Sequence, residues 1–289
     1  LNALTLLANF LIIPGLTYGS QLALGALGVT LVYGVLRFSN FAQGETMAFG
    51  AMITILVTWG LQSIGVSIKP LPTALIAIPI GITVTAILTL AIDKVVYRYH
   101  RGRRANPVIF LIVSIGVMFF MGGLIRFIIG PGDQIFFDGT RFILKAQEFK
   151  EMTGLNEGLS LKMTQAVTIA MALIIVTAMF WFLNHTRTGK SMRAYSDNED
   201  LALLSGIDPD RVVMVTWIIV AALATVGGTL YGLDKSFKPF AFKITDDGLP
   251  KIIEDYDIEM KAKKKGFDVL NLSSEDKFQV LEKVFENGE

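Results

Sequence analysis

The sequence predicts an all-α protein, a polytopic bundle of transmembrane helices followed by a short soluble helical tail. Hydrophobic residues make up 52% of the chain and charged residues only 18%, and the mean hydropathy is +0.55. Charge is unevenly distributed, because the first 233 residues contain 28 charged side chains and the last 56 contain 23. The first part holds about six hydrophobic segments of the length that crosses a bilayer, roughly 20 residues.

The first hydrophobic stretch, residues 1–36, contains no charged residue. It exceeds one membrane span but falls short of two. Pro14-Gly15 interrupts it, and proline inside a helix removes a backbone hydrogen bond. We therefore expect a short helix over 5–13 that does not span the membrane alone, and a full span over 16–35.

Five further hydrophobic segments follow. Asn106-Pro107 marks the start of one of them. Several contain proline or glycine, which membrane helices tolerate because neighbouring helices satisfy the backbone groups that are released. The expected segments are 46–61, 71–92, 108–125, 164–182 and 212–233.

The connections between these segments predict the orientation. Residues 93–104 contain five Lys and Arg, and a short connection so rich in basic residues marks the cytoplasmic side. Alternation then places 126–163 outside and 184–211 inside. The outer connection also has five basic residues, diluted over 38 positions.

Sequence motifs for nucleotide binding or catalysis are incomplete. Thr188-Gly189-Lys190-Ser191 ends like a phosphate-binding loop, but Asn184 stands where that loop requires its first glycine. The chain has no cysteine, and its two histidines, His100 and His185, lack spacing partners for a metal and are expected as solvated loop residues. We expect no catalytic residue, no metal site and no cofactor in this chain.

The sequence gives little support to two classes of membrane protein. A secondary transporter shows inverted repeats and membrane-embedded charges, and we find no repeat. A membrane-embedded enzyme needs clustered titratable groups near one face of the bundle, and the sequence contains no such cluster.

Polar residues separate the first two spans with hardly any connection between them. Arg37, Asn40, Gln43 and Glu45 fall within ten positions of each other. Polar side chains at membrane depth are costly and usually face a cavity or a partner. Two interpretations remain open at this point: a polar segment inside the membrane, or a short interfacial turn whose charges reach the headgroups.

The predicted inner connection 184–211 carries signals for a short helix. Asp197 or Asn198 can cap its N-terminus, and the acidic residues that follow suit the positive first turn. Leu201, Ala202 and Leu204 give it an apolar stripe, and Gly206 can end it. Such a helix could dock on a soluble partner, or it could be a solvated connection between two spans.

These two segments resemble one family. Residues 15–51, above all Gly28-Val-Thr-Leu-Val-Tyr-Gly-Val-Leu-Arg-Phe-Ser-Asn-Phe-Ala-Gln-Gly-Glu, resemble the N-terminal signature of branched-chain amino acid ABC transporter permeases. Residues 187–232, with Arg-Thr-Gly-Lys-Ser-Met-Arg-Ala and later Leu-Leu-Ser-Gly-Ile-Asp, resemble the cytoplasmic loop and next helix of the same family. The resemblance covers about residues 1–240.

The resemblance implies a permease subunit of the bacterial inner membrane that imports branched-chain amino acids. It implies four kinds of partner: a second permease, two cytoplasmic ATPase subunits that bind ATP-Mg, a periplasmic substrate-binding protein and the lipid bilayer. Relatives carry other amino acids, amides or urea, which remain alternative cargoes, and nucleic acid is not expected as a partner.

The same resemblance assigns residues to roles. A coupling helix that fits the ATPase would use Arg187, Gly189, Met192, Arg193, Ala194, Asp197, Leu204 and Gly206. The signature turn, near the pathway, would comprise Arg37, Asn40, Phe41, Gln43, Gly44 and Glu45. Gln43 and Glu45 stand where the family commonly has histidine and aspartate, so the polarity of the turn is kept while a proton-linked role is not supported.

The last part of the chain departs from this pattern. The resemblance implies a transmembrane domain over 1–240, with further membrane helices to follow, whereas residues 241–289 are polar. Ser273-Ser-Glu-Asp276 looks like a capping box that opens a short amphipathic helix. We expect a C-terminally truncated or fused permease, non-functional if its pathway is incomplete, or alternatively a genuine regulatory tail.

Overall fold

The computed structural model describes residues 2–66, 72–103, 105–130, 132, 134, 136, 142–144 and 160–234. The chain divides into two units, residues 1–239 and 240–289. All described residues belong to the first unit, so the predicted polar tail 241–289 and its capping box lie outside the described residues.

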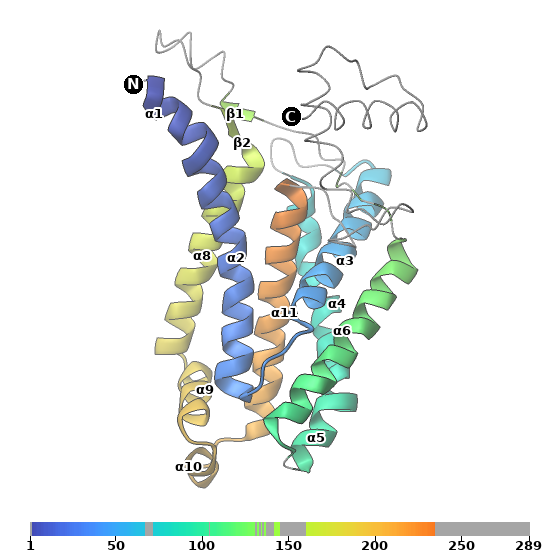
Figure 1. Cartoon of the computed structure of the whole chain (residues 1–289), viewed down its shortest axis with the longest axis vertical. Coiled ribbons are helices and arrows are strands. Elements are labelled where there is room, and N and C mark those ends of the chain that lie inside the picture. Colours follow the sequence, from blue (N-terminus) through green and yellow to red (C-terminus); the bar gives the residue numbers. More distant parts are fainter. Residues whose placement is uncertain are drawn as a thin grey trace, which may run out of the picture. The chain divides into compact units, whose positions relative to one another are not determined.

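Six helices of the first unit are long and apolar enough to cross a membrane, and the expected helical bundle is thereby confirmed (Figure 1). Three short π-helical segments, labelled η, extend the first and third of these helices. The elements, in chain order, are α1 (Asn2–Leu7), η1 (Ala8–Ile12), α2 (Ile13–Leu31), η2 (Val32–Leu36), α3 (Gln43–Ser63), α4 (Ala74–Ile92), η3 (Asp93–Tyr97), α5 (Arg98–Gly102), α6 (Pro107–Ile129), β1 (Phe142–Leu144), β2 (Leu161–Lys162), α8 (Met163–His185), α9 (Arg187–Asp197), α10 (Glu199–Leu204) and α11 (Pro209–Asp234). β1 and β2 form a small antiparallel pair.

The first span does not break at Pro14, contrary to the sequence prediction. Helix continues from α1 through η1 into α2, and the apolar span covers Thr5–Leu36. Pro14 falls in the first turn of α2, and the amide of Ile13 bonds back to the carbonyl of Ala8, five residues earlier. The wider π-helical turn shifts the hydrogen-bond register just before the proline, so the missing donor does not end the helix.

The basic segment 93–104 is also more regular than predicted. Instead of a loop, the third span continues through η3 and α5 as far as Gly102. The next span begins where the sequence predicted, with Asn106 accepting a hydrogen bond from the amide of Val108 (3.2 Å) and Pro107 in the first helical position. Asparagine caps and proline at the first position are both favourable at a helix start.

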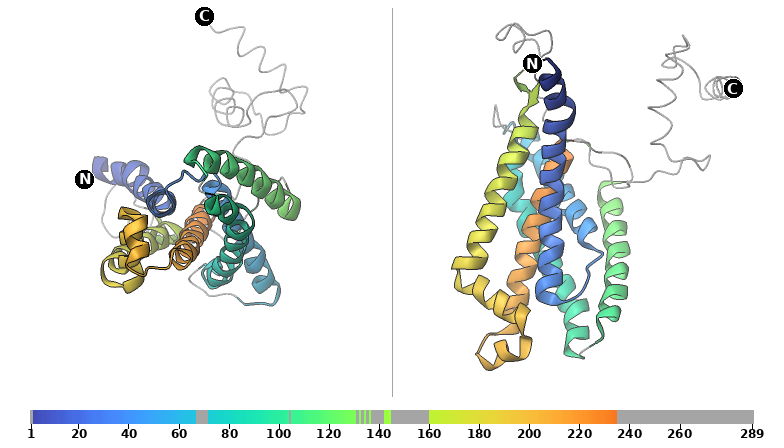
Figure 2. Two further views of the ribbon diagram at one scale, coloured as in Figure 1. Left: turned by 90° about the horizontal axis from the view of Figure 1, so that it is seen from below. Right: turned by 60° about the vertical axis from the view of Figure 1, so that its left-hand side comes forward.

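Helix α11 lies at the centre of the bundle, packed against α2, α3 and α4 (Figure 2). Small residues allow this close packing. A Cβ on Gly50 of α3 would lie 2.7 Å from the Cα of Thr225, and one on Gly228 would overlap the backbone carbonyl of Met47. In a bilayer the apolar solvent offers no hydrophobic drive between helices, so such close backbone contact is a main source of helix association.

The two ends of the bundle differ. α5, α9 and α10 lie together at one end, and β1 and β2 lie at the other, beside α1 (Figure 1). This arrangement agrees with the predicted alternation of connections, which puts 93–104 and 184–211 on one side and 126–163 on the other. We refer to the end with α9 and α10 as the α9–α10 end.

Candidate functional site

The chain leaves helical geometry between η2 and α3. Arg37 adopts left-handed backbone angles (φ 58°), which is unusual for a residue other than glycine. The following residues run into the bundle, and α3 begins there at Gln43 (Figure 1). We call residues 37–42 the connecting segment.

Side-chain hydrogen bonds hold the connecting segment, both from α6 and η3 and from within the segment. The Ser114 hydroxyl of α6 accepts from the amide of Phe41 (3.2 Å) and lies 3.3 Å from the carbonyl of Ser39. The Asn40 carboxamide oxygen accepts from the amide of Ala42 (3.1 Å) and from the hydroxyl of Tyr97 (3.3 Å). Non-helical backbone is tolerated at membrane depth when protein covers it in this way. These bonds are compatible with the intramembrane interpretation, which stays a prediction.

The residues of the signature turn differ in exposure. Arg37, Phe41 and Gly44 are exposed, whereas Asn40 and Gln43 are buried. Gln43 packs on α2, where a Cβ on Gly28 would lie 2.5 Å from its amide nitrogen. Neither the nitrogen nor the oxygen of the Gln43 side-chain amide has a hydrogen-bond partner among the described residues.

Glu45 points toward α6 rather than toward α2. Its carboxylate lies 3.4 Å from where a Cβ on Gly122 would sit, and Arg126, one turn further along α6, attracts it electrostatically. A half-buried carboxylate on a membrane span is costly unless it faces a partner or a cavity. The start of α3 therefore carries a buried amide on one side and a half-buried charge on the other.

Predicted coupling residues fall mainly on α9, a segment that the sequence analysis treated as a loop. The Thr186 hydroxyl caps this helix by accepting from the amide of Gly189 (3.0 Å). Asn198, one of the two predicted caps, caps α10 by accepting from the amide of Leu201 (3.1 Å). α10 is followed by Gly206, whose φ of +79° requires the left-handed conformation.

The eight predicted coupling residues do not share one face. Met192 is fully buried, and a Cβ on Gly189 would overlap the carbonyl of Phe182, so both residues seat α9 against the bundle. The others are exposed, and the Leu204 side chain is 86% exposed. The exposed residues are Arg187, Arg193, Ala194, Asp197, Leu204 and Gly206.

Helix α9 is tied to the end of η2 by three hydrogen bonds that link residues about 160 positions apart. One terminal nitrogen of Arg37 donates to the carbonyls of Ser196 (2.9 Å) and Asp197 (3.2 Å). The Ser196 hydroxyl donates to the carbonyl of Gly34 (2.6 Å). In the sequence, Arg37 and α9 belong to separate features, and no local pattern indicates that they are in contact.

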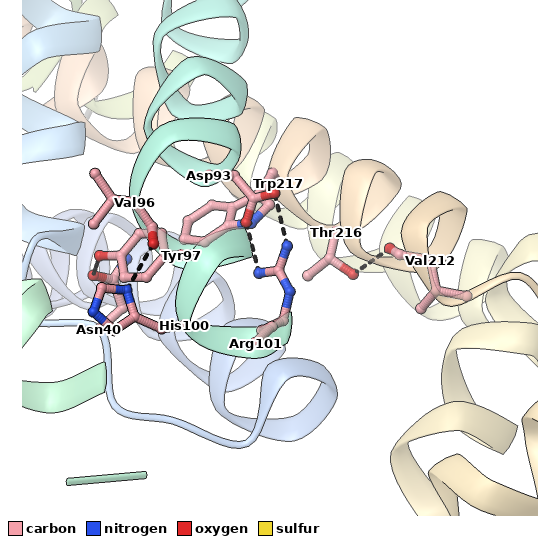
Figure 3. Close-up of polar contacts among 9 residues, drawn as sticks. All are labelled: Asn40, Asp93, Val96, Tyr97, His100, Arg101, Val212, Thr216 and Trp217. Carbon is pink, nitrogen blue, oxygen red and sulfur yellow. Dashed lines mark hydrogen bonds and ion pairs between the residues drawn. The ribbon is translucent and has the colours of Figure 1, made fainter. Parts of the chain in front are cut away.

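A second cluster at the same end was missed altogether. Arg101 donates from its two terminal nitrogens to the two oxygens of Asp93 (2.7 and 2.9 Å), and the indole of Trp217 donates to the same carboxylate at 2.7 Å (Figure 3). Tyr97 stacks on Trp217 with ring centroids 5.4 Å apart. The only available signal was an aspartate at the end of an apolar run, which gave no indication of its partner in α11.

The two histidines have structural neighbours. His100 is half-buried, and its Nδ1 lies 2.8 Å from the carbonyl of Val96, so the expected solvated loop is wrong for this residue. His185 is exposed and stacks on Trp181. Within the described part of the chain, no group of three His, Cys, Asp or Glu side chains could hold a metal ion.

Comparison with known proteins identifies the family. A family model described as "Branched-chain amino acid transport system / permease component" matches residues 11–249. The chain belongs to this family. It is a multi-pass protein of the bacterial inner membrane, with the six spans described above.

Curated relatives agree with the assignment. The permease is 30% identical to the high-affinity branched-chain amino acid transport system permease protein LivH of Salmonella typhimurium, over 75% of this chain and 68% of LivH. It is 28% identical to BraD of Pseudomonas aeruginosa, over 77% of this chain and 70% of BraD. A fructose import permease protein, FruG of Bifidobacterium longum, is 24% identical over 65% of this chain and 51% of FruG. No solved structure matches this permease.

Proposed function

We propose that this permease is one subunit of an ATP-driven importer for branched-chain, hydrophobic amino acids, and that α9 and α10 receive the force from its ATPase partners. The partners are a second permease, two cytoplasmic ATPases that bind ATP-Mg, and a periplasmic substrate-binding protein. The observation that carries the proposal is the attachment of α9 to Arg37, because it joins an exposed helix pair to the connecting segment inside the bundle.

The exposed surface of α9 and α10 suits a protein partner. It combines charge with apolar area, since Arg187, Arg193 and Asp197 lie on α9 and the exposed Leu201 and Leu204 lie on α10. Leucine side chains exposed by 60% and 86% at adjacent turns are typical of a contact site when charged residues surround them. Gly189 and Met192 would serve coupling indirectly, by holding α9 rigidly on the end of α8.

Movement of α9 would reach the pathway through the connecting segment. Arg37 and Ser196 tie α9 to η2, and the next residues lead directly to Gln43 and Glu45 at the start of α3. ATP binding by the partners would then favour one of two positions of this segment, because a ligand shifts an equilibrium only through different affinities for the two states. Gln43 and Glu45 would change their surroundings in that step.

Branched-chain amino acids are the best-supported cargo. Relatives that are 28% and 30% identical to this permease are named for this transport. The fructose permease in the same comparison indicates that related bundles serve different cargoes, so the choice of substrate rests on side chains rather than on the fold.

A coupling test compares two charge-neutral double variants. The Arg193→Ala/Asp197→Ala variant removes two exposed charges from α9. The Arg98→Ala/Asp210→Ala variant removes an exposed ion pair (2.7 Å) at the same end of the bundle, and such pairs stabilise little. The complete complex is reconstituted in liposomes, and leucine uptake and ATP hydrolysis are measured together.

We expect the first variant to lose about tenfold or more of the uptake per ATP, since coupling energies of 1–3 kcal/mol correspond to roughly 5- to 150-fold. The control should keep the wild-type ratio. Uptake that needs no ATPase would contradict the importer, and would instead support a secondary transporter. An equal ratio in both variants would contradict the role of α9.

Arg37→Lys tests the link between α9 and the connecting segment. Lysine keeps the charge but cannot reproduce the geometry with which one arginine reaches two carbonyls. We expect this variant to assemble with the ATPases and to transport poorly, whereas failure to assemble would indicate a role in docking instead.

A further inference from the structure

A cavity of about 390 Å³ lies at the α9–α10 end of the bundle. It is bounded by the end of η2, by α5 and the start of α6, and by α9 and α10. Small-molecule sites in proteins begin at about 300 Å³. Some of these elements, namely α9, α10 and the end of η2, are those that the coupling proposal requires to move.

The walls divide into apolar and charged parts. Val35, Leu36, Phe110 and Leu203 supply apolar surface. The charged lining consists of two guanidinium groups, Arg37 and Arg101, and two carboxylates, Glu199 and Asp200. A cavity that is rich in both signs of charge, with an apolar wall beside them, suits a ligand that carries both charges itself.

Three of these charges converge on the hydroxyl of Tyr195. That hydroxyl donates to Glu199 (2.9 Å), and both Arg37 and Arg101 act on it electrostatically. Burial and the bond to Glu199 raise the pKa of Tyr195 to about 12, and the two arginines offset part of this rise. The pattern places both guanidinium groups near one another and near the acidic start of α10.

The four charged groups differ in the hydrogen bonds that they already make within the protein. Arg101 holds Asp93 with both terminal nitrogens, and Glu199 accepts from Tyr195. Arg37 uses one terminal nitrogen for the carbonyls of α9. The Asp200 carboxylate is exposed, and no residue of the described part of the chain bonds to it. Asp200 is thus ready to hold an ammonium group, and the remaining nitrogens of Arg37 to hold a carboxylate.

We propose that this cavity binds a zwitterionic amino acid with an apolar side chain, that is, the released cargo entering from the cytoplasmic side. Its ammonium would meet Asp200, its carboxylate would meet Arg37, and its side chain would lie against Phe110 and Leu203. The occupant bridges α10 and the start of α6, so it restrains the helix pair and inhibits transport. The inference rests on the proposed function for the identity of the cargo and of this face.

The chemistry argues against ligands of a single charge. A simple anion would meet Glu199 and Asp200, and a simple cation would meet both arginines, each at close range where like charges repel. The headgroup of phosphatidylethanolamine is also zwitterionic, and it is the main competing source of the same chemistry. Its acyl chains would have to leave the cavity toward the bilayer, whereas a free amino acid needs no such exit.

Two measurements test the site. The first is equilibrium binding of radiolabelled L-leucine to the detergent-purified complex without the substrate-binding protein. The second is transport by proteoliposomes whose ATPase side faces outward, with loaded binding protein inside and L-leucine added outside. Each variant is compared with its own rate in the absence of outside leucine.

Two variants alter the cavity by independent means. Asp200→Asn removes the carboxylate on an exposed position, and Ala105→Phe fills the cavity from the connection before α6. Asp234→Asn is the control, because it removes a carboxylate from the last residue of α11. Because Asp200→Asn removes the negative charge that would face the ammonium group, we expect this variant to weaken leucine binding by at least about tenfold. Both cavity variants should relieve the inhibition, and the control should not.

The outcomes separate the two proposals. Leucine that neither binds nor inhibits the wild type overturns the site, as does equal inhibition in wild type and in both cavity variants. A response to phosphatidylethanolamine content without a response to leucine also overturns it. If the wild-type complex shows no ATP-driven transport, the importer proposal fails, while the binding measurement still decides whether the cavity holds leucine.

Discussion

Removal of the Asp93 carboxylate is the sharpest test of how the α9–α10 end is held together. Asp93 accepts two bonds from Arg101 and one from Trp217, and only 8% of its surface is exposed. In Asp93→Ala, the guanidinium of Arg101 stays largely buried (22% side-chain exposure) without its counter-ion. Breaking a buried pair by removing one partner costs about 3–5 kcal/mol, and the residual exposure of both partners places our expectation near 3 kcal/mol.

Trp217→Phe separates the indole bond from the ion pair. It removes one hydrogen bond to a charged acceptor, about 1.5–3 kcal/mol, and keeps most of the ring contact with Tyr97. Because Trp217 acts through the carboxylate, we expect the loss in the double variant to be smaller than the sum of the two single losses. The exposed pair Arg98–Asp210 is the control, and its removal should cost less than about 1 kcal/mol.

The assay is unfolding of the purified permease in mixed detergent micelles. It measures the melting temperature and the midpoint of the unfolding transition. A stability of Asp93→Ala within about 0.5 kcal/mol of the wild type, a value typical of a surface substitution, would refute the reasoning. Strict additivity of Asp93→Ala and Trp217→Phe would refute the claim that the indole and the guanidinium share one acceptor.

Two further predictions concern α9. Gly189→Ala should shift the α8–α9 corner and lower both stability and uptake, because the new methyl group overlaps the backbone carbonyl of Phe182, which cannot move aside as a side chain can. The matched control is Gly15→Ala, whose Cβ has no atom within 4 Å, and equal melting temperatures of the two variants would contradict the claim. Tyr195 should make stability fall in alkaline solution, since its pKa is raised from about 10 in the unfolded chain to about 12 in the folded protein. Its contribution is complete below pH 10 and is lost as the pH rises toward 12, so Tyr195→Phe should flatten the decline of the melting temperature between pH 9 and 11.5, and an unchanged decline would exclude this origin.

The positions of the membrane helices could be predicted because the necessary information is local. Apolar runs of about 20 residues are read without knowledge of their neighbours, and the caps at Asn106 and Asn198 act within three residues of themselves. Residues 187–197 were harder, since a polar helix with one buried side, formed by Gly189, Met192 and Tyr195, lacks a long apolar pattern.

Candidate site residues could likewise be predicted only where the information is local. Family resemblance identified Arg37 and the α9 segment, but only the fold brought them into contact, and it also divided the coupling residues into buried supports and exposed surface. Asp93, Arg101 and Trp217 escaped notice because each has an ordinary setting in the sequence, and their bonds span 8 and 124 positions.

The amino-acid pattern was enough to identify a helical membrane protein of a recognisable permease type, because bilayer thickness and the need to satisfy backbone groups leave few alternatives for such a pattern. Three features became visible only in the folded chain: the continuity of the first span at Pro14, the packing of α11 against Gly50 of α3, and the contact of Arg37 with Ser196. These features depend on contacts between residues far apart in the chain, whose close approach becomes favourable only when all the surrounding helices are in place.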